Sequence, residues 1–307
     1  MFGVYSPPTL RSNRFSAKSP EIQSLIKMHK YLIAVIAFHG FYAYSATTKV
    51  DVAIIGGGLS GLSTAKYLAA AGKSFAILEA RDRVGGRVLN ANLPGGHAEE
   101  LGAAYVGPTQ DRVLALAKEL SLSTYKAYTA GNSTFYRNGS LIHYQDSLGG
   151  IPPVDIASLI ELATFMNDIN EMASKVDLNA PWNTPDAESL DSVTLETWVN
   201  ARLSTADARI LINNAIPAIL STEMKEPSLL FTLWYIAAAG NETGPGTINR
   251  LIGVADAAQD SRINGGSQLL ATRLAAKLGW KNIYLKAPVR KVKLENGRYT
   301  VTSDSVT

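Results

Sequence analysis

The sequence predicts an α/β fold with a parallel sheet, and three neighbouring segments support this. "VDVAIIGG" (50–57) is a continuous apolar run, too short for a helix and rich in β-branched residues, which is typical of a buried strand. In "LSTAKYLAAAG" (62–72) apolar residues recur at helical spacing, and Gly72 is placed to cap the helix. "SFAILEA" (74–80) predicts a second strand. A strand, a glycine turn, a helix and a strand in this order predict a Rossmann-type nucleotide-binding unit.

The composition is that of a globular protein: 46% hydrophobic and 18% charged residues in a chain of 307. The net charge of +3 is small and scattered, which argues against a nucleic-acid partner. Cysteine is absent, so disulfides, thiolate metal sites and a cysteine nucleophile are excluded within this sequence. The four histidines are not at metal-ligand spacing, and we expect no metal.

The glycine turn has the spacing Gly56-x-Gly58-x-x-Gly61. The first glycine permits a tight turn, the second lets backbone N–H groups approach a pyrophosphate, and the third lets the helix pack close to the strand. The helix N-terminus, with Ser60 at its opening, favours phosphate charge. Glu79 ends the second strand, 18 residues after Gly61, where an acid accepts hydrogen bonds from ribose hydroxyls. The segment therefore predicts dinucleotide binding.

The residues after Glu79, "ARDRVGGR", indicate which dinucleotide is bound. A nicotinamide enzyme has no standing need for a second glycine pair and further arginines here. In a flavin enzyme, Gly85-Gly86 let another backbone segment approach the diphosphate, and Arg87 adds fixed charge. The pattern Glu-x-Arg-x-x-x-Gly-Gly-Arg after a Rossmann unit resembles that of the GG-doublet flavoproteins. FAD is therefore the predicted cofactor.

Later segments resemble the flavin monoamine oxidases of animals and fungi, in the same order along the chain. They are "ELGAAYVGPTQDRVLALAKELSLSTYK" (100–126), "APW" (180–182), "LLFTLWYI" (229–236) and "INGGSQLLATRLAAKLG" (263–279). The resemblance covers about residues 49–301. It implies oxidative deamination of primary or secondary amines, with oxygen as acceptor, to an aldehyde, ammonia and hydrogen peroxide. An L-amino-acid or polyamine oxidase, or a noncatalytic FAD-binding remnant, stays open, and the resemblance also allows a homodimer.

The resemblance implies two sets of site residues. The residues expected to contact FAD are Gly56, Gly58, Ser60, Gly61, Glu79, Arg81, Gly86, Arg87 and Val289. The residues expected around the substrate are Tyr105, Ala218, Ile219, Leu251, Ile252 and Gln259, with the amide of Gln259 facing the amine. Ordinary packing roles remain open for this second set. One departure from the family is Ala103-Ala104, where a glycine pair is usual.

The predicted domain organisation has three parts. Residues 1–46 form a leader, 49–124 and 260–307 an FAD-binding domain, and 125–259 a largely helical substrate domain inserted into it. Within this domain, "IASLIELATFMNDINEMA" (156–173) is expected to be helical, because Ile156, Leu159, Ile160 and Ala163 form an i, i+3, i+4, i+7 stripe. After the "GPTQ" turn, helical spacing is expected to bury Val113, Leu116, Ala117 and Leu120.

The leader predicts export. A basic start at Lys27–Lys30, an apolar run at Tyr31–Phe38 and the small-x-small pattern Ala43-Tyr44-Ser45 are laid out as in a secretory signal peptide starting at Met28. An uncleaved membrane anchor, or a disordered leader with a surface apolar segment, stays open. Sequons at Asn132, Asn138 and Asn241 are compatible with secretion.

The sequence ends at Thr307, within an expected β-hairpin ("GRYTVTSDS"). We expect the chain to be C-terminally truncated relative to the family, with the catalytic residues beyond residue 307. Little amine oxidase activity and weak flavin retention follow as expectations for the chain alone. We also expect "LLFTLWYI" to expose an apolar face and promote aggregation.

Overall fold

The computed structural model describes residues 47–145 and 150–304 of the chain. By their internal contacts, Lys49–Asp304 form one compact unit. The expected signal segment lies outside the described residues. In the part that is described, no helix is both long and apolar enough to cross a membrane.

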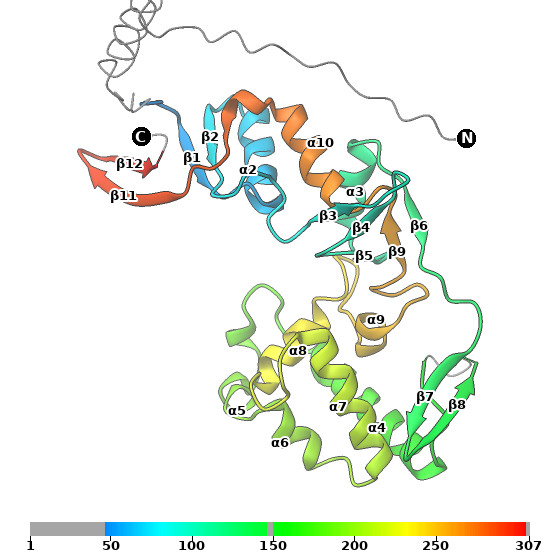
Figure 1. Ribbon diagram of the computed structural model, residues 1–307. Helices are drawn as coiled ribbons and strands as arrows, with labels where there is room; N and C mark the ends of the chain where they lie inside the picture. The colour runs from blue at the N-terminus through cyan, green and yellow to red at the C-terminus, as the bar shows by residue number, and fades with distance from the viewer. Residues whose placement is uncertain (1–46, 146–149, 305–307) are drawn as a thin grey trace, which may run out of the picture. The chain divides into compact units, whose positions relative to one another are not determined.

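The glycine turn follows the first strand of a parallel sheet of three short strands (Figure 1). β1 (Val52–Ile55) pairs with β2 (Phe75–Leu78), which pairs with β10 (Ile283–Tyr284). α2 (Leu59–Ala70) joins the first two strands. Every residue of β2 is buried, which suits the apolar sequence of a strand covered on both faces. The predicted strand–helix–strand unit is confirmed. The expectation that its first strand is buried is wrong, because Ala53 and Ile55 of β1 are exposed and only Ile54 is buried; β1 is an edge strand of the described sheet. Gly72 lies one position beyond the C-cap residue Ala71 and has φ of +67°, a common way to end a helix.

α10 (Gln268–Leu278) packs against α2. The core beside this sheet receives Leu270, Ala271, Leu274 and Ala275 from α10. α3 (Asp111–Glu119) adds Ala117, followed by Leu120, with Val113 and Leu116 half-buried, so the predicted face of this helix is confirmed. Glu119 links the three helices through ion pairs with Lys66 of α2 and Lys277 of α10.

A second group of strands is antiparallel. β9 (Ser261–Ile263) lies between β5 (Tyr105–Val106) and β6 (Thr124–Lys126), so residues 135–157 positions apart in sequence are paired. β3 (Asn90–Asn92) pairs separately with β4 (Ala98–Glu100). β3 and β4 lie in the sequence between the second glycine pair, Gly85-Gly86, and Tyr105.

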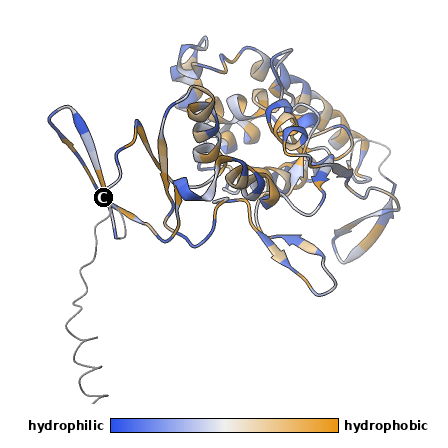
Figure 2. Ribbon diagram, turned by 90° about the horizontal axis from the view of Figure 1, so that it is seen from above, coloured by the Kyte–Doolittle hydropathy of each residue, from blue (hydrophilic) through white to orange (hydrophobic). Residues whose placement is uncertain are grey.

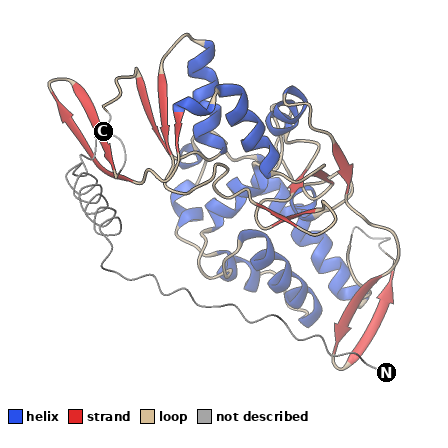
Figure 3. Ribbon diagram, turned by 45° about the horizontal axis from the view of Figure 1, so that its top comes forward, coloured by secondary structure: helices blue, strands red, loops and turns tan. Residues whose placement is uncertain are grey.

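The helical part has its own hydrophobic cluster, separate from that of the parallel sheet. Its elements are α4 (Ile156–Ser174), the 3-10 turn η1 (Pro181–Asn183), α5 (Ala187–Asp191), α6 (Leu195–Asn200), α7 (Ala206–Leu220), α8 (Leu229–Ala237) and α9 (Ile248–Ile252). Figure 3 shows this run of helices, interrupted only by loops, and Figure 2 shows hydrophobic and hydrophilic residues mixed along them. The predicted domain limits at 124/125 and 259/260 stay a prediction.

The expectation that "LLFTLWYI" exposes an apolar face is wrong. These residues form most of α8, which is in contact with α4, α5 and α6. Leu229, Leu230, Leu233 and Ile236 are buried, whereas Phe231 is 44% exposed. A helix that is hydrophobic almost all round is one that other helices enclose.

The helix predicted from the apolar stripe at residues 156–163 is confirmed as α4, but the stripe is not its buried face. Ile156 and Ile160 are 75% and 63% exposed, and Ala163 is exposed as well. The buried face consists of Ser158, Leu162, Phe165, Ile169 and Ala173. Phe165 determines this face because its ring packs on Trp198 with centroids 5.3 Å apart. The α4 sequence contains two apolar stripes, and tertiary packing selects the one with the aromatic residue.

Two hairpins complete the described chain. β7 (Ser133–Arg137) pairs with β8 (Ser140–Tyr144), and β11 (Val289–Glu295) pairs with β12 (Arg298–Ser303). Both turns are Asn-Gly, at 138–139 and 296–297, with positive φ at both residues, as a type I′ hairpin turn requires. The hairpin predicted near the end of the sequence is confirmed. The 3-10 turn η2 (Trp280–Asn282) precedes β10.

Candidate cofactor-binding site

The three glycines of the first turn have different environments. Gly56 has φ of +102°, which favours glycine. A Cβ on Gly61 would stand 2.1 Å from the carbonyl oxygen of Gly56, so α2 can lie this close to β1 only with glycine here. A Cβ on Gly58 would meet no atom within 4 Å. The turn thus excludes a side chain at Gly61, where the helix packs on the strand, and leaves open space at Gly58.

The N-terminus of α2 begins directly after this open space. Its N-cap is Gly58, and no side chain caps the helix by a hydrogen bond. Ser60 lies exposed in the first turn. The first N–H groups of a helix lack partners within the helix and carry partial positive charge. This end of α2 therefore has the features of an anion-binding position, next to a glycine that leaves room for a ligand.

Glu79 connects the end of β2 to the glycine turn. The side chain is buried, with 5% of the residue exposed. Its Oε2 accepts a hydrogen bond from the Gly57 N–H at 2.7 Å, and its Oε1 accepts one from the Arg81 N–H at 2.9 Å. Each carboxylate oxygen has a further lone pair, so ribose hydroxyls can still donate to it. Glu79 thus also stabilises the turn, a role that the sequence pattern did not indicate.

The second glycine pair lies directly on the first turn. The N–H of Gly85 donates to the Gly57 carbonyl at 2.9 Å, and Gly85 forms a parallel bridge with Gly58. Gly86, with φ of +60°, would bring a Cβ to 3.4 Å from the Cα of Gly58. Two glycine-rich backbone segments therefore meet at the start of α2, the arrangement by which a second backbone approaches a diphosphate.

Two residues that sequence reasoning missed hold this second loop. Arg83 donates from Nη2 to the Gly86 carbonyl at 3.1 Å. Gln268 donates from Nε2 to the Val84 carbonyl at 3.2 Å, and its Oε1 accepts from the Asn90 N–H at 2.9 Å. Arg83 was visible in "RDRVGGR", but nothing in its spacing shows that it folds back on the loop. Gln268 is 184 residues from Val84, so no local pattern could indicate it.

Of the remaining residues expected at the cofactor, Arg81 and Arg87 are exposed and Val289 is half-buried at the start of β11. Arg87 also contributes its backbone. Its carbonyl accepts from the Ala103 N–H at 3.2 Å, and a Cβ on Gly102 would stand 2.1 Å from it. The close approach that needs a glycine therefore falls on Gly102. Ala103 is exposed and Ala104 is half-buried.

The segment that follows Tyr105 lies against the loop that carries Gln259, one of the residues expected around the substrate. Gly107 lies so close to the loop after α9 that a Cβ would stand 2.6 Å from the Ala257 carbonyl. Gln259 lies near the end of this loop, and its side-chain amide is directed at backbone carbonyls at the end of α9. Leu251 and Ile252 are partly buried against the helical core. The expectation that the Gln259 amide faces the amine stays a prediction.

Ala218 and Ile219 lie apart from this group, in the last turn of α7. Ala218 is exposed and Ile219 half-buried. Among the described residues, no hydrogen bond joins them to Leu251, Ile252 or Gln259. α7, which carries Ala218 and Ile219, and α9, which carries Leu251 and Ile252, both pack against α4.

Lys126 and Asp260 fix the loop between α9 and β9. Both carboxylate oxygens of Asp260 accept from Lys126 Nζ at 2.7 Å. The Asp256 N–H and the Ser261 hydroxyl also donate to this carboxylate. The hydrogen bond from Lys126, and next that from Ser261, lower the pKa of Asp260 to about 2. The loop that carries Gln259 is therefore held by an ionised carboxylate.

We expect Asp260→Asn to lower the free energy of unfolding at pH 7 by about 1 kcal/mol, since one strong hydrogen-bonded ion pair is lost. Because the folded pKa lies below the ordinary value of 3.8, the ionised form stabilises the fold above that pH, and this contribution is lost as pH falls towards about 2. In urea titrations the difference between Asp260→Asn and the parent should shrink over this window. A difference independent of pH would contradict the assignment, and Asp304→Asn, half exposed on the β11–β12 hairpin, is the surface control.

Two further features bear on the site. In the part of the chain that the structure describes, no group of three or more His, Asp or Glu side chains is arranged to hold a metal. An open surface hollow of about 490 Å³ lies at α5, lined by Asp186, Glu188, Ser189 and Ser192. These four residues belong to neither set of expected site residues, and the hollow gives no reason to move the candidate site.

Comparisons with known proteins place the chain in a family. The model for flavin containing amine oxidoreductases matches residues 59–306. Amine oxidase [flavin-containing] A of Sus scrofa is 34% identical over 251 residues, 81% of this chain and 46% of that protein. Amine oxidase [flavin-containing] B of Homo sapiens is 33% identical over 244 residues, 79% of this chain and 45% of that protein.

A solved structure of putrescine oxidase bound to putrescine superposes with a TM-score of 0.76 at 32% identity, covering 85% of this chain and 56% of that one. The chain thus spans about half the length of the relatives that it matches. These likenesses confirm the predicted α/β fold class, and a flavin, the predicted cofactor, is part of the family's description. The chain belongs to the flavin containing amine oxidoreductase family.

Proposed function

We propose that this protein is an FAD-dependent amine oxidase and that the described residues bind the adenosine diphosphate half of FAD. The proposed reaction is oxidative deamination of primary or secondary amines, with oxygen as acceptor, to aldehyde, ammonia and hydrogen peroxide. The observation that carries the proposal is the contact of Gly85-Gly86 with Gly57-Gly58 beside Glu79, in a chain of this family.

The residues present fit FAD. Gly58 leaves space beside an uncapped helix N-terminus, which suits a diphosphate. The buried Glu79 carboxylate suits the ribose hydroxyls. Ser60, Gly86, Arg81 and Arg87 would supply further contacts to the phosphates, and Val289 an apolar contact to the adenine. When bound, the flavin supplies the two-electron oxidation of the amine to an imine, and the protein's part is to bind, orient and desolvate the amine.

We place the amine next to Tyr105, Leu251 and Ile252 on the strength of the family resemblance; the close approach of Gly107 to the loop after α9 supports this placement. The orientation of the Gln259 amide supports a second role for that residue: it holds the end of α9 so that the two aliphatic side chains keep their places. Ala218 and Ile219 remain proposed cavity residues on the strength of the family resemblance. A diamine substrate is the second candidate, supported by the likeness to putrescine oxidase.

Glu79 gives a direct test of cofactor binding. We expect Glu79→Ala to weaken FAD binding by at least about tenfold, since it removes the ribose acceptor and also the acceptor of the Gly57 N–H. Glu79→Gln keeps one acceptor oxygen and should lose less. The measurement is a fluorescence titration of the purified protein with FAD. Equal affinities in the parent and Glu79→Ala would contradict the placement of the ribose.

Activity is tested by peroxide release with benzylamine, tyramine and putrescine in the presence of FAD. We propose that these 307 residues alone turn over slowly or not at all; the support is that the chain spans about half the length of its relatives. Steady peroxide release with bound flavin would overturn this. FAD binding without peroxide release, even when the chain is supplied as part of a longer protein, would favour the noncatalytic alternative.

We also propose that the protein is exported, on the basis of the basic, apolar and small-residue layout of residues 27–45. When it is expressed from Met28, the mature chain should begin near residue 46. N-terminal sequencing of the secreted protein checks this. Secreted or membrane-bound material that still contains Tyr31–Phe38 would contradict cleavage, and the membrane-bound form would favour an uncleaved anchor.

A further inference from the structure

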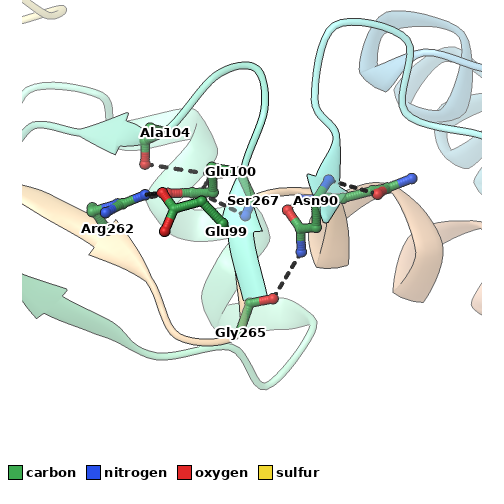
Figure 4. A network of polar contacts seen from close by, with 8 residues as sticks. Asn90, Glu99, Glu100, Ala104, Arg262, Gly265 and Ser267 are labelled. Atoms are coloured by element: carbon green, nitrogen blue, oxygen red, sulfur yellow. Dashed lines mark hydrogen bonds and ion pairs between the residues drawn. The ribbon is translucent and has the colours of Figure 1, made fainter. Parts of the chain in front are cut away.

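Glu100, the last residue of β4, is a buried carboxylate with both oxygens held. Its side chain is 2% exposed. Arg262 of β9 donates from Nε to Oε2 at 2.7 Å, and Ser267, just before α10, donates its backbone N–H to Oε1 at 2.8 Å and its hydroxyl to the same oxygen. Figure 4 shows these groups converging. The two partners are 162 and 167 residues from Glu100 in the sequence.

Arg262 connects this carboxylate to Tyr105. The two residues are direct partners in the β5–β9 pairing, and the guanidinium carbon lies 5.8 Å from the centre of the Tyr105 ring. This distance is within the range of a cation–π interaction. Arg262 also donates from Nη2 to Glu99 at 3.2 Å, but that carboxylate is 54% exposed. The buried partner of the arginine is therefore Glu100.

The segment between Glu100 and Tyr105 has little apolar anchoring of its own. Leu101 is 63% exposed, Tyr105 is 51% exposed, and Gly102 and Ala103 are exposed between them. Backbone hydrogen bonds attach the segment to the second glycine loop: Leu101 N–H to the Leu89 carbonyl at 2.8 Å, and Ala103 N–H to that of Arg87. Since hydrophobic burial does not fix this segment, polar contacts must do so.

We propose that Glu100 and Arg262 are positioning residues for the substrate side of the site. They hold the ring of Tyr105 in place and keep residues 101–103 against the loop that carries Gly85-Gly86. The inference rests on the proposed function, in which Tyr105 borders the amine. The planar guanidinium engages Glu100 and Glu99 through different nitrogens while it faces the ring, which a lysine ammonium could not reproduce.

The first test compares two adjacent glutamates that share the arginine. We expect Glu100→Gln to speed hydrogen exchange in peptides covering residues 98–106 by about tenfold, because a buried carboxylate with charged and neutral donors is lost. Glu99→Gln, at the exposed partner, should change it by less than about twofold. Arg290→Met, which breaks the surface pair with Asp304, is the control for loss of a surface charge. Equal exchange in Glu100→Gln and Glu99→Gln would overturn the proposal.

The second test separates positioning of Tyr105 from general stability. In protein labelled with 3-fluorotyrosine, the Tyr105 resonance is assigned as the one missing in Tyr105→Phe. It should shift in Arg262→Met and Glu100→Gln, stay in Glu99→Gln, and be only partly restored in Arg262→Lys. An unshifted Tyr105 resonance in Arg262→Met, or full restoration by lysine, would contradict the proposal.

Both tests use the 307-residue chain without FAD, so they stand even if the proposed function is wrong. If the parent protein fails to bind FAD but shows these local effects, the proposed function fails and the positioning network remains. If FAD binds but the local effects are missing, the network proposal fails alone.

Discussion

Gly58→Val should leave the fold intact and abolish tight FAD binding. Gly58 has an extended backbone, φ −74° and ψ 177°, that valine adopts readily, and a Cβ there would meet no atom of the chain within 4 Å. The fold should therefore lose no more than about 1 kcal/mol, the cost of a poor N-cap residue. The side chain would fill the space assigned to the diphosphate and remove several charge-assisted hydrogen bonds, worth together about 3 kcal/mol or about 100-fold in affinity.

The measurement is a flavin fluorescence titration, with thermal unfolding of the same samples. Gly58→Ala is the matched intermediate, because it adds one methyl group at the same point. If Gly58→Val binds FAD as well as the parent protein does, the diphosphate does not lie at this turn.

Gly61→Val should have the opposite result: we expect it to destabilise the fold, whereas Gly58→Val weakens FAD binding. Its Cβ would stand 2.1 Å from the Gly56 carbonyl and 3.2 Å from Cγ2 of Ile54, so α2 must move away from β1. Leu62 and Ala65, both fully buried, would be pulled out of the core with it. Overpacking of this kind costs about 3 kcal/mol.

The test compares the urea unfolding midpoints of Gly58→Val and Gly61→Val with that of the parent protein. Gly58→Val and Gly61→Val place the same side chain three residues apart in one turn, so each is the control for the other. A Gly61→Val protein with the unfolding midpoint of the parent would show that the third glycine is not required for packing.

The elements that the sequence predicted well are those whose determinants lie close together in the chain. The strand–turn–helix–strand unit of residues 52–78 and the Asn296-Gly297 hairpin depend on local residue types. The burial of α8 was mispredicted, and the buried face of α4 is not the stripe that predicted the helix, because burial depends on distant partners. Ile160 and Leu162 are equally plausible core residues until Trp198 packs on Phe165 and selects one face.

The candidate site shows the same division. The glycines and Glu79 follow from a local pattern, but the hydrogen bonds of Gly57 with Gly85 and with Glu79 appear only in the folded chain. Arg262 and Gln268 act on residues more than 160 positions away, so no spacing in the sequence could indicate them. The expected role of the Gln259 amide towards the amine stays a prediction. Its partners in the structure are backbone carbonyls at the end of α9, which no sequence pattern displays.

The central claim is that the described residues bind FAD by its adenosine diphosphate half, and competition calorimetry tests it most directly. The purified chain is titrated with FAD, with ADP, and with FMN, which carries the flavin ring but lacks the adenosine. We predict that FAD and ADP bind, that ADP displaces FAD, and that FMN binds far more weakly than either. Tight binding of FMN without competition from ADP, or no binding of FAD and ADP at all, would contradict the claim.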